Sequence, residues 1–131
     1  MTLIELIKKA RRARQFAQAP YSRFKVGAAL EAQKRRVFCG CNVESASYGL
    51  TACAERIAIW RALADGETKF RRLVVVADTE ELTPPCGACR QIIWEYCGDI
   101  EVVLANLRGD IVRHKMRSLL PEPFDQRFLE K

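Results

Sequence analysis

The sequence predicts an α/β fold in which helices pack against a central mixed sheet, and three observations point to it. Segments with helical spacing of apolar residues alternate with short apolar runs, in the order α-β-β-α-β-α-β-β. The run Leu73 to Ala77 is rich in valine, as expected of a buried central strand. The chain has 131 residues, so we expect 1–131 to form a single domain.

The first half of the chain predicts a helix, a hairpin and a second helix. A helix over about 2–18 has apolar residues along one face and ends before Pro20. Two strands near 25–32 and 36–41 are joined by a polar turn and form a hairpin. After a polar loop, a helix runs over about 53–64.

The second half of the chain predicts three more strands and one helix. The central strand covers 72–77 and is followed by a loop that contains Pro84 and Pro85. A helix over about 87–97 comes next, and strands near 101–105 and 110–114 complete the sheet. The five strands and three helices account for most of the chain.

The positive charge of the chain raises nucleic acid as a partner. The formal net charge is +6, but the basic clusters are short and are not interleaved with aromatic residues. We therefore interpret them as solvated surface and expect no nucleic-acid partner. No apolar run approaches the roughly 20 residues that span a bilayer, so no membrane partner is expected.

The six cysteines are not needed as disulfides, because a chain of this size can bury a core without them. The basic segment 1–14 has the positive charge of a transit peptide, but Glu5 breaks the acid-free pattern of such peptides. We therefore expect a cytoplasmic location. In that reducing compartment cysteines are more often metal ligands or catalytic groups than disulfides.

Two short segments carry the chemistry, and each begins a predicted helix. One contains Cys53, and the other contains Cys86 and Cys89 in C-x-x-C spacing, which brings two sulfurs within reach of one ion. The positive end of a helix favours the thiolate that binds metal. Three protein ligands leave one position of a tetrahedral zinc ion open, which is typical of a catalytic site.

Glu55 and Arg56 directly follow the first of these cysteines along the chain. At a helix end that points at the metal, Glu55 can take a proton from water and deliver it to a substrate. Three thiolates on one Zn²⁺ leave an excess negative charge, which weakens the metal as a Lewis acid. Our hypothesis is that Arg56 offsets this charge by hydrogen bonding to the sulfurs.

These residues resemble the small, homotetrameric class of cytidine deaminases, in a zinc deaminase family that uses a glutamate beside the metal. The resemblance covers almost the whole chain in order. It is carried by 21–30, 40–51 and the paired Cys-Ala-Glu-Arg and Pro-Cys-x-x-Cys-Arg-Gln motifs, which are highly specific. It implies a three-layer α/β/α sandwich with a central mixed five-stranded sheet.

The resemblance also implies a role for each matching residue. Zn²⁺ would be bound by Cys53, Cys86 and Cys89, with Glu55 as the proton shuttle. The substrate contacts would be Asn42 and Glu44 on the ribose 3′-hydroxyl, Phe24 stacked on the base, and the backbone of Ala54 on the base edge. Tyr48 and Phe124 match residues that enter a neighbouring subunit's site, which implies a homotetramer with shared active sites. Ser45 departs from the common Asn, but it lies beside the sugar-binding pair.

The implied reaction is hydrolytic deamination of cytidine, and of deoxycytidine, to a uracil nucleoside and ammonia in pyrimidine salvage. Zinc-bound hydroxide would attack C4 of the pyrimidine while Glu55 carries the proton to N3. A small-molecule aminohydrolase such as blasticidin S deaminase shares the zinc motifs, but Asn42 and Glu44 fit cytidine better. A polynucleotide-editing deaminase needs a groove for flanking nucleotides, and this chain has no insertion to build one.

Simpler interpretations of the cysteines remain beside this one. The three motif cysteines could form a closed structural zinc site, with Cys39 or Cys41 as the fourth ligand. A redox role for the C-x-x-C segment lacks a thioredoxin-like context. Cys97 and the single histidine, His114, are expected to be structural or exposed, and no role is assigned to them.

Overall fold

The computed structural model describes residues 1–130, and a five-stranded mixed sheet in the order β2-β1-β3-β4-β5 forms its centre. The strands are β1 (Val26–Ala32), β2 (Val37–Cys41), β3 (Phe70–Ala77), β4 (Glu101–Ala105) and β5 (Ile111–Lys115). The β3–β4 pair is parallel and the other three pairs are antiparallel. The expectation that the valine-rich strand is central is confirmed, since β3 is the middle strand.

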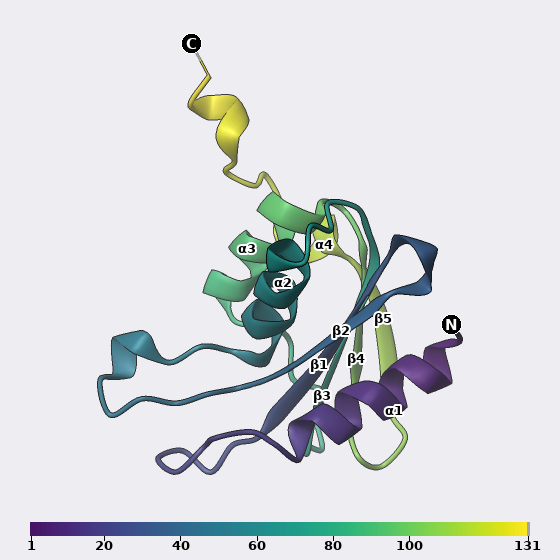
Figure 1. Cartoon of the computed structure of the whole chain (residues 1–131), viewed down its shortest axis with the longest axis vertical. Coiled ribbons are helices and arrows are strands. Elements are labelled where there is room, and N and C mark those ends of the chain that lie inside the picture. The colour runs from purple at the N-terminus through teal and green to yellow at the C-terminus, as the bar shows by residue number, and fades with distance from the viewer. Residues whose placement is uncertain (131) are drawn as a thin grey trace.

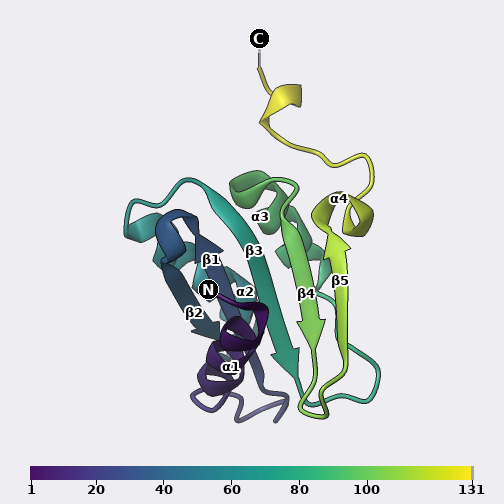
Figure 2. The ribbon, with the colours of Figure 1, turned by 90° about the vertical axis from the view of Figure 1, so that its right-hand side faces the viewer.

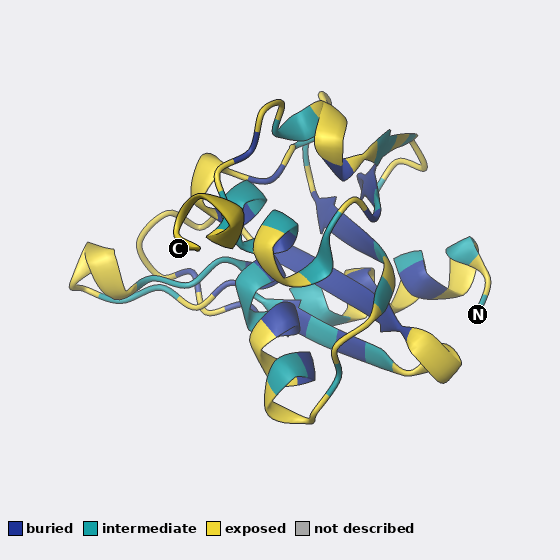
Figure 3. Cartoon of the chain, turned by 90° about the horizontal axis from the view of Figure 1, so that it is seen from above, coloured by how far each residue is buried: buried dark blue, intermediate teal, exposed yellow. Residues whose placement is uncertain are grey.

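Helices cover both faces of this sheet, which confirms the three-layer α/β/α sandwich (Figures 1 and 2). One face carries α1 (Leu3–Arg14), and the other carries α2 (Ala54–Ala64) and α3 (Gly87–Cys97). A short helix that the sequence did not predict, α4 (Met116–Leu119), follows β5. Figure 3 shows the sheet buried between its helical layers.

The pleat of β3 explains why both faces are covered. Val74 and Val76 pack with Leu6 on the α1 side, whereas Leu73 and Val75 belong to the core beneath α2 and α3. Successive side chains of a strand point to opposite faces, so the continuously apolar part of β3, Leu73 to Ala77, needs a layer on each side. The N-terminal segment is thus part of the core, through the fully buried Leu6.

The predicted bounds of most elements agree with the structure to within two residues, but α1 is shorter than expected. It ends at Arg14 rather than near residue 18. The N–H groups of Phe16 and Ala17 bond to carbonyls three residues back, which tightens the chain into turns. Gln18 then donates its N–H to the carbonyl of Asn42, so pairing with a distant loop replaces the last helical turn.

The structure also tests the expectation that no helix spans a membrane. Among residues 1–130, no helix combines the length and apolar character that crossing a bilayer requires.

Candidate metal centre and active site

Three cysteine sulfurs meet where the first turns of α2 and α3 approach each other. The Sγ atoms of Cys53, Cys86 and Cys89 all lie within 4.8 Å of one another. The pair Cys53 and Cys86 is 3.9 Å apart. The sequence therefore identified a group of residues that the fold brings together from positions 33 residues apart in the chain.

The start of each helix explains this convergence. Cys53 is the N-cap of α2, Cys86 is the N-cap of α3, and Cys89 lies in the first turn of α3. Neither N-cap sulfur caps the helix by a side-chain hydrogen bond. The free N–H groups of two helix ends give the region a positive potential that favours thiolates.

The sulfurs are chemically unequal. The Cys89 thiol and the Arg56 guanidinium donate hydrogen bonds to the sulfur of Cys53 and lower the pKa of Cys53 to about 5. The pKa of Cys89 is raised, because its proton is shared with Cys53 and because the residue is buried. The Arg56 Nη2 atom lies 3.4 Å from the Cys53 sulfur. The hydrogen bond expected between this arginine and the sulfurs is present.

The sulfur geometry fits a zinc ion. A tetrahedral ion with Zn–S bonds of about 2.3 Å separates two sulfurs by about 3.8 Å, close to the distance between Cys53 and Cys86. Among the described residues, neither Cys39 nor Cys41 belongs to the cluster, nor does any other histidine, cysteine or carboxylate. The alternative of a closed site with Cys39 or Cys41 as fourth ligand therefore has no support among the described residues, and three sulfurs suit an open zinc site.

Glu55 is the buried acid beside this cluster. It lies in the first turn of α2, only 5% of its surface is exposed, and burial raises its pKa to about 7. A carboxyl group with a pKa near neutrality can both accept and release a proton under ordinary conditions. Glu55 therefore combines a place in the same cavity as the clustered sulfurs with the acidity that proton transfer requires.

A cavity of about 240 Å³ connects the sulfur cluster with most of the predicted substrate residues. Seven residues that the sequence predicts at the site line this cavity: Phe24, Asn42, Glu44, Cys53, Ala54, Glu55 and Cys86. Cys89, the third cysteine of the cluster, is fully buried and does not line the cavity. The predicted base, sugar and metal residues thus share one cavity.

The two predicted sugar residues are held in place by the chain itself. The Asn42 Oδ1 atom accepts from the Val26 N–H at 2.9 Å, and its Nδ2 donates to the Phe24 carbonyl at 2.7 Å. Glu44 accepts from the backbone N–H of Tyr21 and from the backbone and hydroxyl of Ser22, which hold the pKa of Glu44 below its usual range. An amide and a carboxylate retain further hydrogen-bonding capacity after these contacts.

Tyr48 and Phe124 do not line this cavity. Tyr48 is 77% exposed in a protruding loop, and Phe124 is 55% exposed on the C-terminal tail. The tail extends away from the sandwich (Figure 1). Its Phe124 ring stacks on the ring of Phe128. The Trp94 indole N–H anchors the tail to α3 by donating to Asp125 at 2.9 Å.

Other residues that line the cavity were missed by the sequence reasoning. They are Ser22, Val26, Thr51, Val75, Thr83 and Pro84. Ser22 is the most informative, because its hydroxyl donates to Glu44 and its oxygen accepts from the Phe24 N–H. Its position two residues before Phe24 was a weak signal, since serine in a loop usually forms local turns.

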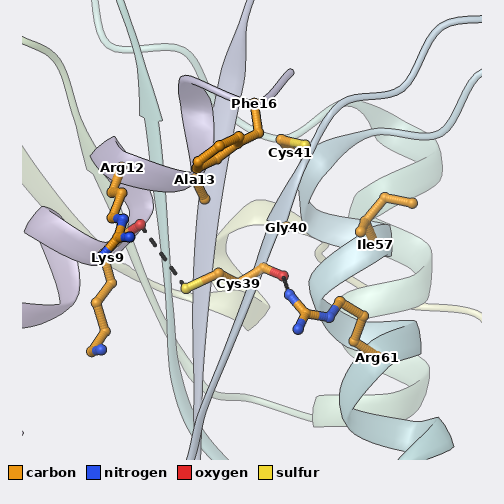
Figure 4. A pocket seen from close by; sticks show the side chains of 9 residues that line it. All are labelled: Lys9, Arg12, Ala13, Phe16, Cys39, Gly40, Cys41, Ile57 and Arg61. Atoms are coloured by element: carbon orange, nitrogen blue, oxygen red, sulfur yellow. Dashed lines mark hydrogen bonds between the residues drawn. The ribbon is translucent and has the colours of Figure 1, made fainter. Parts of the chain in front are cut away.

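A larger groove lies elsewhere, between α1, β2 and α2, with a volume of about 590 Å³ (Figure 4). Cys39 and Cys41 line it, together with Phe16 and Arg61. It contains none of the three clustered sulfurs and no carboxylate. The smaller cavity, with its buried acid and sulfurs, is therefore the better candidate for the chemistry.

Comparison with known proteins identifies the family of the chain. Residues 2–106 match the cytidine and deoxycytidylate deaminase zinc-binding region. The chain is 47% identical over 127 residues to the cytidine deaminase of Sporosarcina psychrophila (96% of this chain, 93% of that protein). It is 51% identical over 120 residues to the cytidine deaminase of Halalkalibacterium halodurans (91% of each). The crystal structure of cytidine deaminase from Burkholderia pseudomallei superposes with a TM-score of 0.92 at 50% identity, covering 95% of this chain and 100% of that one.

Proposed function

The chain belongs to the family of zinc-binding cytidine and deoxycytidylate deaminases, and from this premise we propose that it hydrolyses cytidine, and also deoxycytidine, to the uracil nucleoside and ammonia. The observation that carries the proposal is the single cavity that joins the clustered sulfurs to buried Glu55, Phe24 and the Asn42–Glu44 pair. We assign this catalytic domain to the whole chain, 1–131.

Cys53, Cys86 and Cys89 are the residues that hold Zn²⁺, which when bound supplies a Lewis acid that makes water more acidic. As water adds to C4 of the pyrimidine, Glu55 accepts one proton of this water at its carboxylate and delivers it to N3. Glu55 then carries the proton of the new C4 hydroxyl to the exocyclic amine, so that the C4–N bond breaks, ammonia leaves and a carbonyl remains at C4. Its burial excludes bulk water from this transfer. Arg56 supports the cluster by donating to Cys53.

The remaining cavity residues position the nucleoside. Phe24 stacks on the base and the backbone of Ala54 contacts the base edge, while Asn42 and Glu44 hold the ribose 3′-hydroxyl. Because Glu44 is fixed by Ser22 and Asn42 is fixed by the β1 backbone, the sugar contacts are preorganised. Remote contacts of this kind hold the reacting carbon in place and lower the barrier there.

The charges of the cavity favour a nucleoside over a nucleotide or a polynucleotide. Among its described lining residues there is no lysine or arginine, and two are carboxylates, Glu44 and Glu55. A phosphate would need a cationic or N–H-rich partner and would be repelled by Glu44. This supports cytidine over deoxycytidylate as substrate, and it argues against a polynucleotide-editing role.

We further propose a homotetramer in which neighbouring chains complete each cavity. Tyr48, Phe124 and Phe128 expose large apolar surfaces that a second copy could cover. Phe124 sits on a tail directed away from its own sandwich, as a residue that serves a neighbour would (Figure 2). A cytoplasmic enzyme of pyrimidine salvage is the role that we propose for this assembly.

A direct assay follows cytidine loss by ultraviolet absorbance, with deoxycytidine, deoxycytidylate, blasticidin S and a single-stranded oligonucleotide as alternative substrates. We expect turnover of both nucleosides, little or none of the other three, and loss of turnover after a chelator removes zinc. Restored activity on adding Zn²⁺ is the control for damage by the chelator. Full turnover of zinc-free protein, or a preference for a phosphorylated substrate, would refute the proposal.

A further inference from the structure

A glycine on β2 lies directly beneath the first turn of α2. A Cβ atom built on Gly40 would come within 2.4 Å of the Ala54 carbonyl oxygen and 2.6 Å of the Ala58 nitrogen. Both atoms are backbone, and real Cβ contacts are essentially never shorter than 3.0 Å, so any side chain here forces the main chain to move. Figure 4 shows Gly40 on the strand that faces Ile57 of α2.

The nearer of the two atoms, the Ala54 carbonyl oxygen, belongs to the turn that carries the active-site residues. Ala54 lies between Cys53 and Glu55, and its carbonyl is in the first turn of α2. A displacement of this turn therefore moves a zinc-ligand sulfur and the proton-transfer carboxylate together. The same strand leads two residues later to Asn42, so Gly40 also sets the separation between the sugar contact and the metal helix.

The strand is anchored to its neighbour along its whole length, whereas the start of the helix lacks a side-chain cap. Five residues of β2 pair in register with β1, and Asn42 adds side-chain bonds to Val26 and Phe24. The first turn of α2 has no side-chain cap from Cys53. A Cβ at position 40 should therefore displace the helix rather than the strand.

We propose that Gly40 is a positioning residue that seats the first turn of α2 so that Cys53 reaches Cys86 and Cys89. This rests on the proposed function only where turnover is concerned, because the metal site is defined by the sulfurs themselves. Arg61 assists the seating, since its Nη1 donates to the carbonyl of Cys39 at 2.6 Å, two helical turns further along.

The test compares Gly40→Ala with a matched control, Gly27→Ala. A Cβ on Gly27 would meet the Ala10 carbonyl at 2.0 Å and so displaces α1, on the opposite face from the sulfurs. We expect both substitutions to destabilise the fold. Only Gly40→Ala should weaken Zn²⁺ binding, measured by chelator competition at 10 °C, by about 10- to 100-fold, as for changes around a metal site. The Co²⁺–thiolate absorption bands should change only in that variant.

Turnover gives a second measurement in the same two variants. We expect Gly40→Ala to lower kcat by about 100-fold, as for a 1 Å misplacement, and Gly27→Ala to keep kcat near wild type. If Gly40→Ala does not fold, Arg61→Met is measured in its place, and we expect it to lose Zn²⁺ affinity by several-fold. The proposal is overturned if folded Gly40→Ala binds Zn²⁺ with wild-type affinity and shows wild-type Co²⁺ bands. If Gly40→Ala does not fold, the same result in Arg61→Met overturns it. If Gly40→Ala weakens Zn²⁺ binding as expected but the wild-type protein does not turn over cytidine, the proposed function is wrong and the positioning role of Gly40 stands.

Discussion

The guanidinium of Arg56 donates a hydrogen bond to the sulfur of Cys53 across 3.4 Å, one turn into the helix that this cysteine begins. Its Nη2 atom also reaches the Thr51 carbonyl, and its plane lies over the Trp60 ring. These contacts hold the side chain where its charge acts on the cluster, while its Nε is buried with no partner among the described residues. The electrostatics of the metal site therefore depend on a residue that is not itself a ligand.

Replacing this guanidinium tests that dependence. In Arg56→Gln we expect kcat to fall by about 10- to 100-fold while the bound zinc stays near that of the wild type, because the three sulfurs remain and only their compensating charge is lost. Steady-state kinetics and elemental zinc analysis on the same preparation measure both. Arg56→Lys, which keeps the charge but not the forked geometry, should recover part of the loss. An unchanged rate in Arg56→Gln would rule out this role.

Removing the Glu55 carboxylate separates proton transfer from metal binding. In Glu55→Ala we expect turnover to fall by at least about 100-fold, the range for loss of general acid–base assistance. Zinc content should stay unchanged, since the carboxylate is outside the sulfur cluster. Retained turnover would contradict the proton-transfer role of Glu55. Loss of zinc would show that Glu55 instead contributes to metal binding.

Mixed oligomers test whether neighbouring chains share their cavities. We expect Phe124→Ala to raise KM by about fivefold, since an aromatic contact is worth about 1 kcal/mol. Chains carrying Phe124→Ala and chains carrying Glu55→Ala are then unfolded together and refolded. Some sites will combine an intact Glu55 with a neighbour's intact Phe124, so a component with wild-type KM should appear. Light scattering that finds only monomers, or a mixture with the KM of Phe124→Ala alone, would exclude shared sites.

The Cys97 thiol gives a pH-dependent test of the core. Burial raises its pKa to about 12, from 9.0 when it is unshifted. The folded chain therefore holds this proton more tightly than the unfolded chain, and stability must fall as pH rises from about 9 towards 12. Urea unfolding of the wild type should show a steeper loss with pH than unfolding of Cys97→Ala. Parallel pH profiles would contradict the burial of this thiol.

The elements of the fold were largely predictable because local patterns agree with the tertiary structure. The bounds of α3 and β4 match those predicted, since Gly98 and Pro85 punctuate the chain near the ends of α3. The end of α1 was not predictable, because it depends on Gln18 pairing with Asn42, 24 residues away. Non-local pairing of this kind leaves no periodic signal in the sequence.

The candidate site was predictable to a different degree. Cysteine spacing at two helix starts carries a chemical signature, so the three sulfurs and Glu55 could be named together. Ser22 and Thr83 could not, because single hydroxyl residues in loops are common and their approach to the cavity depends on how those loops fold. The close approach of the α2 backbone to Gly40 could not be predicted either, since a glycine in a strand has several explanations.

The central claim is that three cysteine sulfurs bind one zinc ion and leave a fourth position for a light atom. X-ray absorption at the zinc edge of the purified protein measures this directly. The account predicts three sulfur neighbours at about 2.3 Å and one oxygen or nitrogen neighbour at about 2.0 Å. Four sulfur neighbours, or none, would contradict it.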